Sequence, residues 1–199
     1  MKKTNQAVYT VAHKISSKIR AEKNGHRGAV VWLTGLSASG KSTLAMRVEQ
    51  RLFEAGRQVY VLDGDNVRRG LSSDLGFLPQ DRAENIRRIG EVAALFADAG
   101  VIVITAFISP YGADRAQARK AAGDRFFEVY VKAPLKLCEE RDPKGLYRKA
   151  RAGLISDFTG VSAPYEPPES PEMIVDTATR SEEESVLRLE TFIEDCIRV

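Results

Sequence analysis

Apolar segments of two kinds alternate along most of the chain. Ala29–Thr34 and Val101–Phe107 are almost continuously apolar, as parallel strands that are buried on both faces are. Ser42–Ala55 instead places its apolar residues at three- and four-residue steps, which is the spacing of one helix face. Further strands are predicted at Gln58–Leu62, Phe126–Val131 and Met173–Val175, and further helices at Arg82–Ala99, Ser109–Ala122, Pro134–Arg141 and Ser181–Ile197. This alternation predicts an α/β fold, a parallel sheet with helices on both faces, whose ligands bind beyond the carboxyl ends of the strands.

The first 25 residues do not fit this alternation and resemble an appended arm. Its apolar residues recur at three- and four-residue steps, at Val8, Val11, Ile15 and Ile19. This spacing predicts that part of the arm is an amphipathic helix, whose apolar stripe docks on the body of the protein or on a second subunit. We expect residues 26–199 to form a single domain, because a chain of this length suits one core.

Composition narrows the class of protein. A hydrophobic content of 43% and a charged content of 29% are ordinary for a soluble globular protein. A net charge of +3 is too small to argue for nucleic acid but suits an anionic substrate. Cys138 and Cys196 lack metal-ligand spacing, so we expect buried thiols. We find neither the apolar run of a signal peptide nor one long enough to span a membrane, and expect a cytoplasmic protein.

Residues 35–42, Gly-Leu-Ser-Ala-Ser-Gly-Lys-Ser, match the phosphate-binding P-loop pattern G-x-x-x-x-G-K-[ST]. The motif lies between a predicted strand and a predicted helix, which is the context that the pattern requires. Backbone N–H groups of such a loop surround a phosphate, and the helix N-terminus adds positive potential. In this pattern, Lys41 reaches the β- and γ-phosphates and the Ser42 hydroxyl binds Mg²⁺. The sequence therefore predicts a nucleoside triphosphate site.

A P-loop protein also needs a carboxylate near the metal, often at the end of a strand. The strand Val101–Phe107 ends without an acid, whereas Gln58–Leu62 leads directly into Asp63 and Asp65. Small P-loop kinases tend to place the acid after this second strand. An Asp-Gly turn would explain the same residues, but two aspartates at the ligand-binding edge favour a functional role. Which of the two lies nearer the metal stays open.

Arginines follow this strand at Arg68, Arg69, Arg82, Arg87 and Arg88. Arg68 and Arg82 flank a loop and are the candidates for holding an anionic acceptor, because guanidinium groups bind phosphate or sulfate through paired hydrogen bonds. Further along, Asp142–Tyr165 is long, basic in its first half and still carries apolar residues such as Leu146 and Phe158. We expect a mobile lid, which would exclude water and bring cations to the transferred group.

Several longer motifs accompany the P-loop in a fixed order. They are GLSASGKST (35–43), DGDNVRRGL (63–71), DLGF (74–77), DRAENIRR (81–88), FISPYGADR (107–115), DPKGLYRKAR (142–151), DFTG (157–160) and PYE (164–166). In this order they resemble the adenylylsulfate kinase family, from about Gly28 to Glu166. The N-K-x-D motif that selects guanine is absent, which argues against a GTPase.

The resemblance implies a P-loop NTPase-type kinase fold, ATP and Mg²⁺ as donor and metal, adenylyl sulfate as the acceptor, and a homodimer. It implies an ATP site at Gly35, Leu36, Ser37, Ala38, Ser39, Gly40, Lys41, Ser42 and Thr43, with Arg141 against the base. Ser42 and Asp63 would serve the metal, and Lys41, Asp63 and Ser109 lie at the catalytic positions. The acceptor pocket would comprise Asp65, Arg68, Phe77, Arg82, Asn85, Ile108 and Ser109, with Lys144, Leu146 and Phe158 from the lid.

Two other functions remain open at this point: a different small-molecule or nucleotide kinase of the same fold, and a catalytically silent nucleotide-binding regulator. Ser109 also has two interpretations. It could accept a phosphoryl group or contact the substrate, or it could cap a helix, since Ser109-Pro110 pairs a favoured cap with a favoured first helical residue. We predict the cap, at the border of the acceptor pocket, without an obligatory phosphoenzyme.

Overall fold

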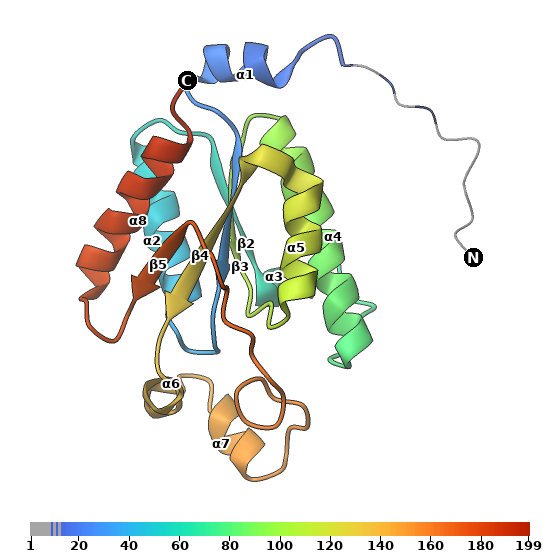
Figure 1. Cartoon of the computed structure of the whole chain (residues 1–199), viewed down its shortest axis with the longest axis vertical. Helices are drawn as coiled ribbons and strands as arrows, with labels where there is room; N and C mark the ends of the chain where they lie inside the picture. Colours follow the sequence, from blue (N-terminus) through green and yellow to red (C-terminus); the bar gives the residue numbers. More distant parts are fainter. Residues whose placement is uncertain (1–8, 10, 12) are drawn as a thin grey trace.

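The computed structural model describes residues 9, 11 and 13–199, and its core is one five-stranded, all-parallel sheet (Figure 1). The strands are β1 (Ala29–Thr34), β2 (Val59–Asp63), β3 (Ile102–Ala106), β4 (Phe126–Lys132) and β5 (Met173–Asp176), in the order β2-β3-β1-β4-β5. The helices are α1 (Ser17–Asn24), α2 (Lys41–Glu54), α3 (Gly64–Val67), α4 (Pro79–Asp98), α5 (Gly112–Ala122), α6 (Leu135–Arg141), α7 (Leu146–Arg151) and α8 (Glu182–Cys196). The predicted parallel α/β sheet with helices on both faces is confirmed.

β1 occupies the centre of the sheet, and all of its residues are buried: five are apolar, and the hydroxyl of the sixth, Thr34, is hydrogen-bonded. Val31 and Leu33 point to the face that α2 and α8 cover, whereas Val30 and Trp32 point to the face under α4 and α5. Val31 is paired with Ile104 of β3 on one side and with Phe127 of β4 on the other. Successive side chains of one strand thus join two separate cores, as the two-residue period of a strand requires.

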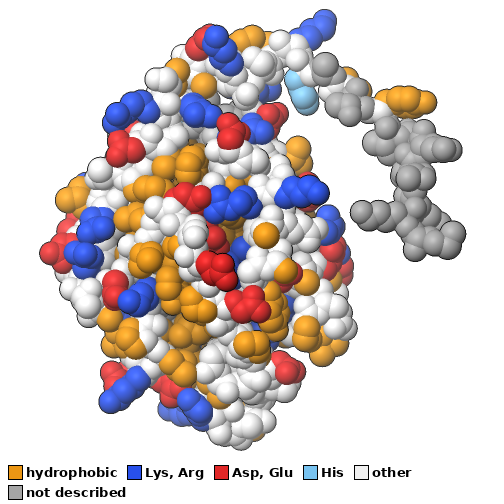
Figure 2. Space-filling model, in the orientation of Figure 1, with side chains coloured by type: hydrophobic (Ala, Val, Ile, Leu, Met, Phe, Trp, Pro, Cys, Tyr) orange, Lys and Arg blue, Asp and Glu red, His pale blue; other side chains and the backbone are white. Residues whose placement is uncertain are grey.

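The outer face of the pair α2 and α8 is charged. Arg47, Arg51 and Arg57 pair with glutamates of α8, and Arg57 places two nitrogens within 3.0 Å of the Glu194 carboxylate. Figure 2 shows basic and acidic side chains interspersed over the visible face. Exposed pairs of this kind contribute little each, so the two helices are held mainly by the apolar residues beneath them.

Two helices begin three residues away from their predicted starts, and the other differences are of one residue. α4 begins at Pro79, three residues before the predicted Arg82, because proline at the first helical position needs no hydrogen-bond acceptor for a missing N–H. α5 begins at Gly112 after the N-cap residue Tyr111, so the predicted helix start at Ser109-Pro110 is wrong. Ser109 has φ +39°, which is outside the conformation of a cap.

The amino-terminal arm contains the short helix α1, whose Ser16 hydroxyl accepts from the Ile19 N–H. Its carboxyl end contacts the body, since Asn24 Nδ2 donates to the Gly100 carbonyl at 3.2 Å. Val11, Ile15 and Ile19 are 48–83% exposed, so these three do not dock on the body of their own chain. Val8 lies outside the described residues. The second predicted docking place, another subunit, stays a prediction.

The segment 142–165 carries a helix that the sequence did not predict, α7, which lies with α6 beyond the carboxyl ends of the strands (Figure 1). A third apolar cluster forms here around Tyr147, Phe158 and Cys138. Both cysteines are free, Cys138 buried and Cys196 partly exposed. Among the described helices, none combines the length and the apolar character needed to cross a membrane.

α4 and α5 approach each other closely at Gly90, where an added Cβ would lie 2.9 Å from the Ala118 Cα. Alanine normally stabilises a helix interior relative to glycine by about 0.5–1 kcal/mol. Here we expect Gly90→Ala to destabilise the protein by about 1–3 kcal/mol, because the two helices must separate. Urea unfolding measures this, with Gly70→Ala as the control, since nothing lies near that position. An unchanged or higher midpoint for Gly90→Ala would refute the close packing.

Candidate active site at the carboxyl ends of the strands

The loop between β1 and α2 is shaped by close backbone packing. At Gly35 a Cβ would lie 2.4 Å from the Val131 carbonyl oxygen, so only glycine lets the loop leave β1 beside β4. Gly40 has φ +103°, which brings the chain into α2 in a conformation that other residues rarely adopt. The loop therefore turns its backbone around a space at the amino terminus of α2, as a phosphate-binding loop does.

Lys41 lies inside this loop and is 7% exposed. Its Nζ donates to the Gly35 carbonyl at 2.9 Å, to the Leu36 carbonyl at 2.7 Å and to Ser39 Oγ at 3.4 Å. Burial lowers the pKa of Lys41 to about 8, because the ammonium has lost most of its water and nearby charges compensate only in part. All three of these hydrogen-bond partners are neutral, so the charge of Lys41 is available to an anion.

The metal prediction concerns Ser42 and Asp63. The Ser42 hydroxyl donates to Asp63 Oδ2 at 2.7 Å, which joins the end of the P-loop to the end of β2. Asp63 Oδ1 accepts from the Asp65 N–H at 3.0 Å, whereas the Asp65 carboxylate is paired with Lys144. Asp63 is therefore the aspartate that lies against the P-loop. A hydroxyl and a carboxylate beside a phosphate loop are oxygen ligands that fit Mg²⁺.

The two candidate acceptor arginines enclose the same loop. Arg68 donates to the Gly76 carbonyl at 2.9 Å, and its guanidinium lies 4.4 Å from the centre of the Phe77 ring. Arg82 donates to the Phe77 carbonyl at 2.8 Å and reaches across to the 142–165 segment, where it meets the Asp157 carbonyl at 2.6 Å and Thr159 Oγ1 at 3.0 Å. Phe77 itself is 67% exposed, although the Arg68 guanidinium already covers one face of its ring.

Two further predicted acceptor residues lie deeper. Asn85 is buried on α4, and its Oδ1 has no hydrogen-bond partner among the described residues. An unpaired buried polar atom of this kind is costly, which favours a ligand or water at this point. Ile108 follows β3, and its carbonyl accepts from Thr34 Oγ1 at 2.7 Å. This hydrogen bond fixes the loop after β3 to the end of β1.

The predicted lid residues are placed as follows. Lys144 contacts Asp65, so the segment already touches α3, the helix directly after β2. Leu146 packs in the third apolar cluster, and the Phe158 ring, 8% exposed, meets Tyr147 edge-to-face at 5.0 Å. Arg141 donates to the Thr177 carbonyl at 2.8 Å, close to the P-loop rather than beside the acceptor loop.

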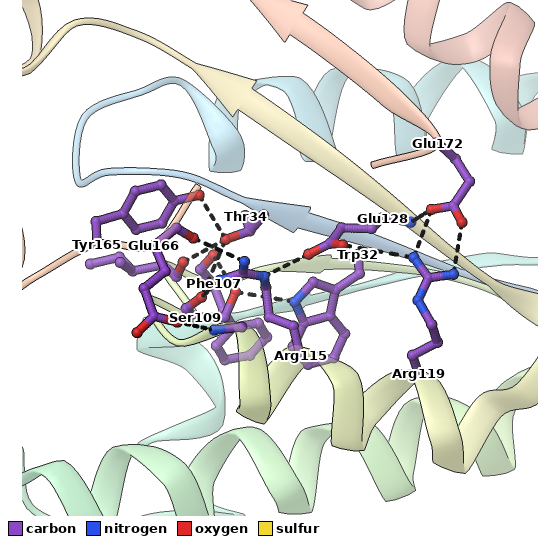
Figure 3. Close-up of polar contacts among 12 residues, drawn as sticks. Trp32, Thr34, Phe107, Ser109, Arg115, Arg119, Glu128, Tyr165, Glu166 and Glu172 are labelled. Atoms are coloured by element: carbon purple, nitrogen blue, oxygen red, sulfur yellow. Dashed lines mark hydrogen bonds and ion pairs between the residues drawn. The ribbon is translucent and has the colours of Figure 1, made fainter. Parts of the chain in front are cut away.

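The predicted helix cap at Ser109 is replaced by a tertiary arrangement (Figure 3). Ser109 Oγ accepts from Trp32 Nε1 at 3.1 Å and lies 3.5 Å from the Phe107 carbonyl. The residue is 2% exposed. The local Ser-Pro signal is overridden because the Trp32 indole N–H, fully buried on β1, needs an acceptor.

The sequence predicted Tyr147 only as an apolar residue of the lid, and it did not predict that Tyr147 and Thr177 contact the P-loop. Thr177 Oγ1 donates to the Ser39 carbonyl of the P-loop at 3.0 Å and accepts from Arg141 at 3.1 Å. The Tyr147 hydroxyl donates to the Ser37 carbonyl at 3.0 Å. Thr177 could have been found from its place directly after the last strand, since strand ends of a parallel sheet meet at one edge. Tyr147 gave no such signal.

Comparison with known proteins decides the family. The family model described as adenylylsulphate kinase matches residues 27–176, which include every predicted site residue. The chain belongs to the adenylylsulphate kinase family. The adenylyl-sulfate kinase of Staphylococcus carnosus is 57% identical over 182 residues, covering 91% of this chain and 92% of the relative. That of Geotalea uraniireducens is 58% identical over 174 residues, covering 87% and 84%.

Solved structures agree with this placement. The adenylylsulphate kinase of Mycobacterium tuberculosis in complex with AMPPNP and APS (adenylyl sulfate) has a TM-score of 0.81 and 51% identity. The match covers 84% of this chain and 98% of that chain. The predicted family, P-loop fold and kinase class are confirmed. The roles of individual residues remain predictions.

We expect Ser109→Ala to lower the free energy of unfolding by about 1–3 kcal/mol, because the buried Trp32 indole N–H loses its acceptor. Ser73→Ala, at an exposed position, is the control and should change stability by less than about 0.5 kcal/mol. A double-mutant cycle with Trp32→Phe, followed by circular dichroism in urea, isolates the pairwise contribution. Independent effects of the two substitutions would contradict the arrangement.

Proposed function

We propose that this protein transfers the γ-phosphoryl group of ATP to the 3′-hydroxyl of adenylyl sulfate, giving 3′-phosphoadenylyl sulfate and ADP. The observation that carries the proposal is the meeting of Lys41, the Ser42–Asp63 pair and the Arg68–Phe77 loop at one edge of the sheet. Family membership supports the acceptor, and the solved relative that holds both AMPPNP and APS supports the pairing of donor and acceptor.

On the donor side, the backbone of residues 35–43 would surround the phosphates. Lys41 would exchange the Gly35 and Leu36 carbonyls for phosphate oxygens, which restores a full charge partner to a buried ammonium. Arg141, held by Thr177, would lie against the base. When bound between Ser42 and Asp63, Mg²⁺ would supply positive charge to the phosphates of the donor.

On the acceptor side, Asp65, Arg68, Phe77, Arg82, Asn85, Ile108 and Ser109 would form the pocket. The Arg68 and Arg82 guanidinium groups would hold the phosphosulfate, and the exposed Phe77 ring would offer its face to the base. Asp63 would orient the 3′-hydroxyl toward the donor. Since phosphoryl transfer passes through a loose transition state, orientation matters more here than proton abstraction.

The segment 142–165 would act as the lid, with Lys144, Leu146 and Phe158 facing the ligands. Phe158 is buried beside Tyr147, so its packing against an adenine requires the cluster to rearrange or the base to dock at the ring edge. Lid closure would exclude water from the transferred group. In-line transfer needs no covalent intermediate, and the Ser109 hydroxyl, which faces Trp32, is proposed to stay unmodified.

We also propose that the enzyme works in the cytoplasm as a homodimer. The exposed apolar residues of the arm, Val11, Ile15 and Ile19, would suit a contact with a second subunit. Light scattering on the purified protein measures the mass directly, and a monomer at micromolar concentration would refute the dimer.

The direct test of the function is an ADP-release assay with adenylyl sulfate, adenosine monophosphate and a panel of sugars and nucleosides as acceptors. Of these acceptors, we expect only adenylyl sulfate to be phosphorylated. Identification of the product should show one added phosphate. Preference for another acceptor would favour a different kinase of this fold. Nucleotide binding without turnover on any acceptor would favour a silent regulator.

Lys41→Ala should lower kcat by about 10²–10³-fold or more, because it removes preorganised charge from the transition state. Far-UV circular dichroism checks that the variant is folded. Near-parental turnover of Lys41→Ala would remove the P-loop from the mechanism.

Asp63→Asn should lower kcat more than it weakens ATP binding, since the proposed role of Asp63 is to position the hydroxyl and the metal. Far-UV circular dichroism again checks the fold of the variant.

The pKa of Lys41, about 8 in the ligand-free protein, predicts a pH dependence of nucleotide binding. Phosphates favour the protonated amine, so the pKa rises on binding and the complex takes up a proton. Affinity for ATP should therefore be flat below pH 8 and fall by up to about tenfold per pH unit above it.

Calorimetry at pH 8.5–9 in two buffers with different ionisation enthalpies measures the proton uptake. The Lys41→Arg variant keeps its charge across this range. Its affinity for ATP should therefore not decline above pH 8, even if that affinity differs from the affinity of the parent protein. A pH-independent affinity of the parent protein, without proton uptake, would show that Lys41 is already fully protonated.

A further inference from the structure

A single buried guanidinium joins three separate parts of the chain. Arg115, in the first turn of α5, has a side chain that is 5% exposed. Its Nε donates to Glu128 Oε1 of β4 at 2.6 Å, Nη1 donates to the Ser109 carbonyl at 2.8 Å, and Nη2 donates to the Glu166 carbonyl at 2.9 Å. Figure 3 shows Arg115 between these groups. The Thr34 hydroxyl of β1 also contacts this loop and the Tyr165 hydroxyl, and Arg115 adds the Glu128 carboxylate of β4 and the Glu166 carbonyl.

The loop after β3 is held in an unusual conformation at the point that Arg115 touches. Ser109 has φ +39°, a backbone region that residues other than glycine avoid. Conformations of this kind persist only where surrounding contacts over-determine them. Those contacts are the Trp32 indole on Ser109 Oγ, Thr34 Oγ1 on the Ile108 carbonyl, and Arg115 on the Ser109 carbonyl.

The chain at the end of the lid, at Tyr165 and the following residue Glu166, is fixed to the same loop. The Glu166 N–H donates to the Pro110 carbonyl at 2.9 Å, and Glu166 Oε2 accepts from the Gly112 N–H at 2.7 Å. The neighbouring Tyr165 hydroxyl lies 3.1 Å from Thr34 Oγ1, and its ring stacks on Tyr130 at 6.0 Å. The carboxyl-terminal end of the lid thus rests on the loop that borders the proposed acceptor pocket.

The charge arrangement suggests why an arginine stands here. Burying an ion pair is rarely a source of net stability, and apolar residues of the same volume often serve as well. A guanidinium, however, has donors in a rigid planar fork and can hold a carboxylate and two carbonyls in fixed relative positions. A lysine at position 115 could keep a positive charge opposite Glu128, but it could not hold the three acceptors in the same relative positions.

We propose that Arg115 is a positioning residue for the phosphoryl acceptor: it fixes the loop at Ile108–Ser109 to the end of the lid, so that acceptor binding and lid closure act on one rigid unit. The proposal rests on the proposed function for its substrate. Glu128 orients the guanidinium from β4.

The test compares Arg115→Lys with Arg119→Lys in the full chain. Arg119 lies one turn further along α5, also faces Glu128 at 3.7 Å, and pairs with Glu172 without touching the lid or the acceptor loop. We expect Arg115→Lys to raise the KM for adenylyl sulfate at least about tenfold while the KM for ATP stays within about twofold, because small displacements of a bound reactant are costly. Arg119→Lys should leave both KM values unchanged.

A double variant separates positioning from stability. Arg115→Met should lower the melting temperature because it leaves the buried Glu128 carboxylate with only its longer contact to Arg119, at 3.7 Å, and adding Glu128→Leu should restore most of that loss. The KM for adenylyl sulfate should stay high in the double variant, since the Ser109 and Glu166 carbonyls do not regain their hydrogen bonds to the guanidinium. A parental KM in the stable double variant, or an equal rise of both KM values, would overturn the proposal.

Hydrogen exchange distinguishes failure of this proposal from failure of the proposed function. If the parent enzyme does not phosphorylate adenylyl sulfate, the function is wrong and the KM comparison does not apply. Arg115→Lys should still speed exchange in residues 107–112 and 157–168 relative to Arg119→Lys, because the joint between the two segments is loosened. Equal exchange in the two variants would show that Arg115 fixes neither segment.

Discussion

A buried lysine ammonium held by backbone carbonyls is the interaction on which the rest of the site depends. Lys41 has little contact with water, and its partners are the Gly35 and Leu36 carbonyls and the Ser39 hydroxyl. These neutral groups stabilise the charge only in part, which is why burial lowers the pKa of this amine. The loop must close around Lys41 to provide them, and it can do so only because Gly35 packs directly on β4. A buried positive charge whose partners are all neutral favours the binding of an anion.

Sequence periodicity was sufficient for the sheet but not for the details of its edges. β1 and β3 were predictable because both faces of a central strand are buried, which leaves a continuous apolar run. The start of α5 was not, because the Ser-Pro pair is a local signal whereas Ser109 is fixed by Trp32, distant in sequence. α7 was missed for a similar reason, since its Tyr147 is buried by residues of other segments.

The arginines after β2 show why residue type alone could not assign the acceptor site. Arg87 and Arg88 pair with Glu84, and Arg88 also holds Asp74, so both are occupied within the helix region itself. Arg68 and Arg82 instead donate mainly to backbone carbonyls and carry no carboxylate partner in the described residues. Guanidinium groups without a counter-charge favour an anionic ligand. The sequence could place all of these residues near the pocket, but the partner of each is decided by tertiary contacts.

The forces that hold the proposed lid can be ranked on physical grounds. The contact of Lys144 with Asp65 joins two side chains that are more than 60% exposed, and such pairs contribute little. The cluster of Tyr147, Phe158 and Cys138 is apolar and buried, so separating it exposes surface that water disfavours. At its far end the lid is fixed through the Glu166 carbonyl and N–H. Opening would therefore move the part that carries Lys144 most easily, while the end near Arg115 stays with the acceptor loop and preserves the pocket wall.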